Sequence, residues 1–148
     1  MTIDTERKRR DAGFTLIELM VVLIILGLLA AVVVPRLTGQ SEEARVKVAR
    51  TQVKLLEDAL NQFEVDNGFY PATDQGLTAL VTQPTGGREA KKWRKGGYLD
   101  RVPQDPWGNE YRYMCPGSHG AFDIVSYGAD GMPGGEDNNA DINSWEIK

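Results

Sequence analysis

A single carboxylate lies near the start of the longest apolar segment of this chain. Residues 14–35 make up 22 positions, and Glu18 is the only one with an ionisable side chain. A helix of this length spans roughly 33 Å, enough to cross the hydrocarbon core of a bilayer. A charged side chain in such a segment costs about 2.5–3.5 kcal/mol on insertion scales, so it usually has a partner. The sequence therefore predicts a membrane-spanning helix over residues 14–37 and a functional role for Glu18.

Four consecutive basic residues, Arg7 to Arg10, precede the apolar segment. Basic residues on one flank of a membrane helix hold that flank in the cytoplasm, so the rest of the chain is expected on the opposite side. The alternative is an ordinary secretory signal peptide cut near Leu29-Ala30-Ala31. The apolar run is longer than the 7–15 residues of a typical signal-peptide core. A retained anchor is therefore the favoured interpretation.

The junction between the polar N-terminus and the apolar segment carries a recognisable motif. Gly13-Phe14-Thr15-Leu16-Ile17-Glu18-Leu19 resembles the processing site of type IV pilins and of the pseudopilins of type II secretion. The resemblance implies that a prepilin peptidase removes residues 1–13 as a leader, cutting between Gly13 and Phe14. It also implies that the new N-terminal residue, Phe14, is methylated.

Charge pairing explains why this family places a carboxylate at Glu18. A free amine on Phe14 is positively charged near neutral pH, and opposite charges attract far more strongly in a poorly hydrated site than in water. The resemblance implies that Glu18 pairs with the amine of Phe14 on a neighbouring subunit during assembly. Repeating such a contact between two different surfaces generates a helical filament. The alternative is a Glu18 that reaches water at the membrane surface.

Composition and length limit what the rest of the chain can be. About 110 residues follow the apolar segment, enough for one small domain. The formal net charge is -4, which argues against a nucleic-acid partner. Cys115 is the only cysteine, so an internal disulfide is impossible and a small core residue is expected there.

An amphipathic pattern continues the helix beyond the apolar segment. Apolar residues recur at intervals of three or four, with charged residues between them, which indicates one face packed on a core. Asp66-Asn67-Gly68 is suited to end this helix, because Asn and Gly accept the left-handed conformation. A coiled coil is the alternative, but the stripe covers fewer than three heptads. The stripe consists of Val46, Ala49, Val53, Leu56, Leu60 and Phe63.

Short elements separated by turn residues follow the helix. We expect a brief helix over residues 75–82, a basic surface loop over residues 84–97, and antiparallel strands over residues 110–114 and 122–127, with a possible third strand. Asp105-Pro106-Trp107-Gly108-Asn109 reads as the turn before the first strand.

These later segments narrow the resemblance to the major pseudopilins of type II secretion. The segments that carry it are Asn67 to Pro71, Gln75 to Leu80, Tyr98-Leu99, Pro103 to Asn109 and Gly128 to Gly131. The implied fold is α+β and type IV pilin-like. In it, a long helix, half transmembrane and half amphipathic, packs on a head domain over residues 38–148 with a short antiparallel sheet.

Residues 128–141 gather oxygen-bearing side chains and glycine-rich turns. Such a segment suits Ca²⁺, which takes six to eight oxygen ligands, although composition alone favours an ordinary acidic turn. The resemblance implies a calcium ion held by Asp130, Asp137, Asn139 and the backbone carbonyl of Tyr127. Asp141 ranks below these as a ligand and is expected to brace the loop. The ion's role is expected to be structural.

The sequence predicts a structural subunit and not an enzyme, because His119 and Cys115 are its only histidine and cysteine and lie in an expected hairpin. The resemblance implies a subunit of the periplasmic pseudopilus, anchored in the inner membrane with its head in the periplasm. The implied partners are further copies of the chain, minor pseudopilins, the inner-membrane assembly platform and the prepilin peptidase. Two alternatives stay open: a major subunit of a type IV pilus, and a membrane-anchored calcium-dependent binding module.

Overall fold

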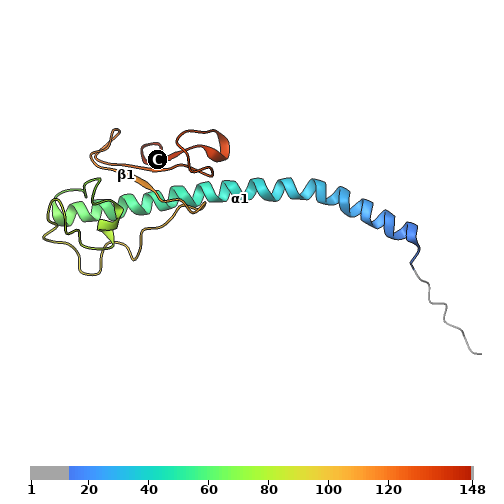
Figure 1. Ribbon diagram of the computed structural model, residues 1–148, viewed down its shortest axis with the longest axis horizontal. Coiled ribbons are helices and arrows are strands. Elements are labelled where there is room, and N and C mark those ends of the chain that lie inside the picture. Colours follow the sequence, from blue (N-terminus) through green and yellow to red (C-terminus); the bar gives the residue numbers. More distant parts are fainter. Residues whose placement is uncertain (1–13, 148) are drawn as a thin grey trace, which may run out of the picture. The chain divides into compact units, whose positions relative to one another are not determined.

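The computed structural model describes residues 14–147, without the side chains of residues 30–40. The predicted leader, residues 1–13, lies outside the described residues, and so does Gly13 of the cleavage motif. The chain divides into two compact units, residues 1–39 and residues 40–148. The second unit contains the sheet, the short helices and the second half of the long helix (Figure 1).

One helix, α1, runs over Leu16–Asn67, 52 residues. At its start, the hydroxyl oxygen of Thr15 accepts the backbone N–H of Glu18 at 3.3 Å, the bond expected of an N-terminal cap. At its end, Gly68 has a φ of 80° and donates its N–H to Glu64 at 2.6 Å. The predicted stop at residues 66–68 is therefore confirmed.

In the part of the chain that the structure describes, no helical stretch combines the length and the hydropathy needed to span a bilayer. Of the predicted membrane segment, residues 14–37, the side chains of residues 30–37 lie outside that part.

The core of the head forms on the predicted stripe of α1. Leu56, Leu60 and Phe63 are fully buried, and burying a side chain of this size stabilises a fold by about 1.5–3 kcal/mol. Phe63 lies at the centre of an aromatic group, with ring centroids 5.6 Å from Phe69 and 5.3 Å from Tyr98. The prediction that this face packs on a core is confirmed.

A three-stranded antiparallel sheet completes the head, in the order β1-β2-β3. The strands are β1 Arg112–Met114, β2 Asp123–Ser126 and β3 Ile142–Asn143. The first two lie inside the predicted ranges but are shorter, and the third was only a possibility from sequence. Ile124 and Ile142 are buried in the core that includes Leu56. Together these elements confirm the α+β, pilin-like fold.

Two short 3₁₀ helices connect these elements, η1 Leu77–Leu80 and η2 Asp137–Asn139, and another, η3 Ser144–Glu146, follows β3. The prediction of a helix over residues 75–82 is therefore wrong in length, because only residues 77–80 are helical. Two carbonyls of η1 accept hydrogen bonds from a later loop and not from the next turn of a helix. The Leu80 carbonyl accepts the N–H of Tyr98 at 2.7 Å, and the Ala79 carbonyl accepts the indole N–H of Trp93 at 2.9 Å. The expectation of a core position for Cys115 is also wrong, since this residue is only half-buried.

Candidate functional site

The loop over residues 128–141 closes on itself at Gly128. This glycine is buried, and its φ is 65°. A Cβ atom at this position would lie 2.9 Å from the carbonyl oxygen of Ala140 and 3.1 Å from that of Asn139. Only glycine fits such a conformation and such a close approach without strain. The start and the end of the loop are therefore packed against each other at this point.

The predicted calcium ligands all lie in or beside this loop. The Asp130 carboxylate accepts the N–H of Met132 at 3.0 Å and is exposed. Asp137 begins η2 with a φ of 54°, and Asn139 ends it with its backbone N–H bonded to Glu136 at 3.0 Å. Tyr127 lies between the end of β2 and Gly128.

Asp141 has the most informative environment in the loop. One of its carboxylate oxygens accepts the N–H of Gly134 at 2.9 Å. The other is buried and has no hydrogen-bond partner among the residues that the structure describes. A buried carboxylate oxygen without a donor is costly, and a bound cation would satisfy it. This observation favours Asp141 as a ligand, whereas the sequence ranked it only as a brace.

No pattern in the sequence could have identified that oxygen, because its burial depends on how the loop closes. Within residues 14–147, no three His, Cys, Asp or Glu side chains are grouped closely enough to hold a metal ion. The residues of the loop fit a cation through one unsatisfied carboxylate oxygen, that of Asp141.

The turn over residues 105–109 is anchored to the sheet by one buried side chain, that of Asp105. The Asp105 side chain accepts the N–H of Trp107 at 3.1 Å and that of Asn109 at 2.8 Å. The hydroxyl of Ser126 donates to the other Asp105 oxygen at 2.7 Å. Asp105 and Ser126 are both buried. The sequence predicted a turn over residues 105–109 but not that Asp105 anchors it to the sheet.

A second buried carboxylate, Asp123, ties the turn between β1 and β2 to the sheet. It accepts the N–H of Ser118 at 2.7 Å and lies 3.1 Å from the ring of His119. Burial raises the pKa of the Asp123 carboxyl, but these hydrogen bonds outweigh burial and bring the pKa below its usual value. His119 also stacks on Trp145, with ring centroids 3.7 Å apart. The cluster therefore joins the turn at residues 117–120 to the C-terminal helix η3.

The apolar side chains at and just before the start of α1 are exposed to solvent in the isolated chain. Phe14 is 86% exposed, Leu16 79% and Ile17 70%. Glu18 is exposed as well, and its carboxylate has no ion pair with any described residue. A contiguous exposed apolar surface of this kind normally contacts a membrane or another protein.

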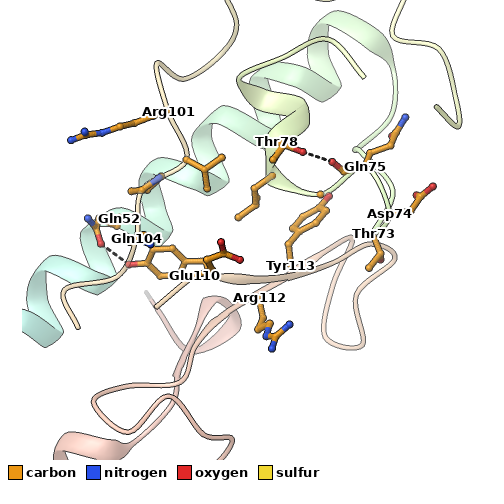
Figure 2. A pocket seen from close by; sticks show the side chains of 15 residues that line it. Gln52, Thr73, Asp74, Gln75, Thr78, Arg101, Gln104, Glu110, Arg112 and Tyr113 are labelled. Atoms are coloured by element: carbon orange, nitrogen blue, oxygen red, sulfur yellow. Dashed lines mark hydrogen bonds between the residues drawn. The ribbon is translucent and has the colours of Figure 1, made fainter. Parts of the chain in front are cut away.

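An open groove of about 870 Å³ lies between α1, η1 and β1. Figure 2 shows Tyr113 turned toward Thr78, and Arg112 on the opposite side of the strand. The Tyr111 hydroxyl donates to the Gln52 side chain at 2.6 Å. Burial raises the pKa of this hydroxyl far above its usual value, with a smaller effect from the Asp105 charge. The groove offers hydrogen-bonding groups to a protein surface or to water, and it implies no particular ligand.

Comparison with known proteins covers nearly the whole chain. Residues 36–145 match the family described as type II secretion system protein G, and residues 8–34 match the prokaryotic N-terminal methylation motif. The chain is 51% identical to the type II secretion system core protein G of Pseudomonas aeruginosa, over 95% of this chain and 99% of that protein. It is 50% identical to the protein of the same name from Vibrio cholerae, over 97% of each chain.

A solved structure agrees with these matches. The crystal structure of the major pseudopilin from the type 2 secretion system of enterohaemorrhagic Escherichia coli superposes with a TM-score of 0.66 at 42% identity. The match covers 76% of this chain and 96% of that one.

Proposed function

The chain belongs to the type II secretion system protein G family, and we propose on that basis that it polymerises into the periplasmic pseudopilus that helps to drive folded proteins across the outer membrane. The observation that carries this proposal is the match to that family over residues 36–145, preceded by the N-terminal methylation motif over residues 8–34. Its role is that of a structural subunit.

Assembly follows from the chemistry of the N-terminal segment. Removal of residues 1–13 creates a positively charged amine on Phe14, and Glu18 provides the opposite charge on a neighbouring copy. Because α1 begins at Leu16, the amine and the carboxylate of one copy stand about one helical turn apart along the chain. The exposed apolar side chains of residues 14–29 support this proposal, because neighbouring helices or lipid would cover them.

The anchor and its partners follow from the same proposal. The basic leader keeps the N-terminus in the cytoplasm, residues 14–37 anchor the chain in the inner membrane, and the head lies in the periplasm. The prepilin peptidase, the inner-membrane assembly platform and the minor pseudopilins are the proposed partners besides further copies of the chain.

A calcium ion is the proposed structural cofactor of the head. Asp130, Asp137, Asn139 and the backbone carbonyl of Tyr127 are proposed ligands, and the unsatisfied carboxylate oxygen adds Asp141. The ion would neutralise the neighbouring carboxylates and order a loop that has few apolar anchors.

Two measurements test the function. Mass spectrometry of the native protein should find a chain that begins at methylated Phe14, and pelleting of sheared cell material should recover it as filaments dependent on the secretion machinery. Long surface fibres that support adhesion or motility would favour a type IV pilus subunit instead. A full-length chain beginning at Met1 and dispersed as monomers would contradict the proposal and favour an anchored binding module.

A further inference from the structure

Both backbone polar groups of Gly128, the residue where the C-terminal loop begins, form hydrogen bonds. Its carbonyl oxygen accepts the side-chain amide of Asn109 at 3.2 Å. Its N–H donates to the hydroxyl of Ser126 at 3.4 Å. The Asn109 amide also lies against Gly131, where a Cβ atom would come within 3.2 Å of the Asn109 side-chain oxygen. The first turn of the loop therefore rests on Asn109.

Asn109 is itself fixed by Asp105, the buried first residue of the turn over residues 105–109. Asp105 binds the Asn109 N–H with its side chain at 2.8 Å, and the Asp105 N–H donates to the Asn109 carbonyl at 2.9 Å. Both backbone groups of Asn109 are thus bonded to one buried residue. Its side-chain amide is thereby held in place to donate to the Gly128 carbonyl.

The same turn reaches α1 on its other side. The indole N–H of Trp107 donates to the Glu42 carboxylate at 3.0 Å. The turn over residues 105–109 thus connects two regions of the head: the C-terminal loop through Asn109, and α1 through Trp107.

We propose that Asn109 is a positioning residue of the cation site, and that ordering of the C-terminal loop by calcium is coupled through the turn over residues 105–109 to the contact between Trp107 and Glu42. This inference rests on the proposed calcium site. Asn109 is not a ligand: it holds the backbone from which the loop departs, so that the carbonyls and carboxylates beyond Gly128 are presented to the ion.

The physical reason is the cost of ordering the loop. Residues 129–139 are all exposed, so few apolar contacts hold them. An ion that binds only the ordered loop must supply the free energy of ordering, and a preformed first turn reduces that cost. Groups that orient metal ligands without touching the metal typically change affinity 10–100-fold when they are removed.

The experiment compares Asn109→Ala with Asn61→Ala in the full processed chain, purified in detergent and stripped with a chelator. Asn61 is a matched control, because its side chain accepts one hydrogen bond, from Tyr70 at 2.9 Å, on an exposed part of α1. Calorimetric titration with CaCl₂ should give a Kd that is 10–100-fold weaker for N109A and within twofold of wild type for N61A. The gain in Tm on adding calcium should shrink only in N109A, which distinguishes positioning from a general loss of stability.

A second readout follows the coupling to α1. In protein labelled with 5-fluorotryptophan, calcium should shift the ¹⁹F resonance of Trp107, assigned with Trp107→Phe. The resonance of Trp93, whose indole bonds to Ala79 on η1, should stay unchanged. In N109A the Trp107 shift should disappear at calcium concentrations that saturate the wild type.

Each outcome decides one claim. An unchanged Kd in N109A would overturn the positioning role, and a Trp107 resonance insensitive to calcium in the wild type would overturn the coupling. Failure of the wild type to bind calcium would overturn both, together with the cation site. Filament assembly is scored separately, so none of these results removes the role as a pseudopilus subunit.

Discussion

Trp107 donates its indole N–H to the carboxylate of Glu42, 3.0 Å away, and so joins positions 65 residues apart in the sequence. Glu42 also binds Arg45 one turn further along α1, at 2.9 Å. The hydrogen bond between Trp107 and Glu42 connects the turn before β1 to the first residues of the part of α1 that packs in the head.

Replacing Trp107 by Phe should lower the free energy of unfolding of the head. The variant keeps most of the ring packing but loses a hydrogen bond to a charged group, and partial exposure to water limits the expected loss to about 1 kcal/mol. Urea denaturation followed by circular dichroism measures this change. Trp145→Phe serves as the control, because no hydrogen bond of its indole is found among the described residues; an equal loss in both variants would argue against a role for the Glu42 bond.

Replacing Glu18 by Ala should leave membrane insertion and leader cleavage intact but abolish filament assembly. The variant removes the carboxylate that is proposed to pair with the Phe14 amine of the next copy. Immunoblotting of processed protein and of sheared filaments separates the two steps. Glu43→Ala, an exposed acidic position on the same helix, should assemble normally, and wild-type amounts of filament from E18A would refute the pairing.

Removing calcium should lower the Tm of the head, and Asp130→Ala and Asp141→Asn should each reproduce the effect in the presence of calcium. A ligand at 100 times its Kd stabilises the folded state by about 2.7 kcal/mol, and this stabilisation is lost on chelation. Thermal denaturation with and without a chelator measures it. Asp74→Ala, an exposed carboxylate outside the loop, is the control; equal melting with calcium and with chelator would rule the site out.

Replacing Asp123 by Asn should destabilise the head at pH 7, and the destabilisation should become smaller as the pH falls below 4. The pKa of Asp123 is below its usual value in the folded state, so its contribution is fully present above the unfolded-state pKa, near 4, and is lost as the pH falls through the lower folded-state value. His119 is the titratable group that faces it, 3.1 Å away. Loss of its charged hydrogen bonds should cost about 2 kcal/mol at pH 7.

Urea denaturation of both proteins at the two pH values tests this prediction. A difference between wild type and D123N that is as large at pH 3 as at pH 7 would show that the ionised form of Asp123 does not stabilise the fold.

Replacing Gly128 by Ala should destabilise the head more than replacing Gly134 by Ala. Both glycines have a positive φ, 65° and 92°, so both variants carry backbone strain of about 1–2 kcal/mol. Only at Gly128 would the new Cβ also meet a carbonyl oxygen, that of Ala140, at 2.9 Å, whereas nothing lies within 4 Å of the one at Gly134. Thermal denaturation ranks the two variants, and equal Tm values would show that the loop relaxes around the added methyl group.

Sequence patterns predicted the elements that depend on neighbouring residues alone. The spacing of apolar residues on α1 identified its buried face, and Asn67-Gly68 marked its end, because both features depend on the geometry of the helix itself. The turns were also found, since Pro, Gly and Asn set their backbone angles. The extent of η1 was not predictable, because Trp93 and Tyr98 bond to its carbonyls from a distant loop.

The sequence by itself determined the processing motif, the long helix with its buried stripe, the family and the segment in which a cation site could form. The tertiary structure alone decided that Asn109 holds the Gly128 carbonyl, that Ser126 binds Asp105, and that one oxygen of Asp141 is buried with no donor among the described residues. The first two contacts join residues 19 and 21 positions apart and follow no period of a helix or strand. They exist only because closure of the sheet brings the two segments together, and hydrogen bonds of this kind depend on distance and direction in space rather than on spacing along the chain.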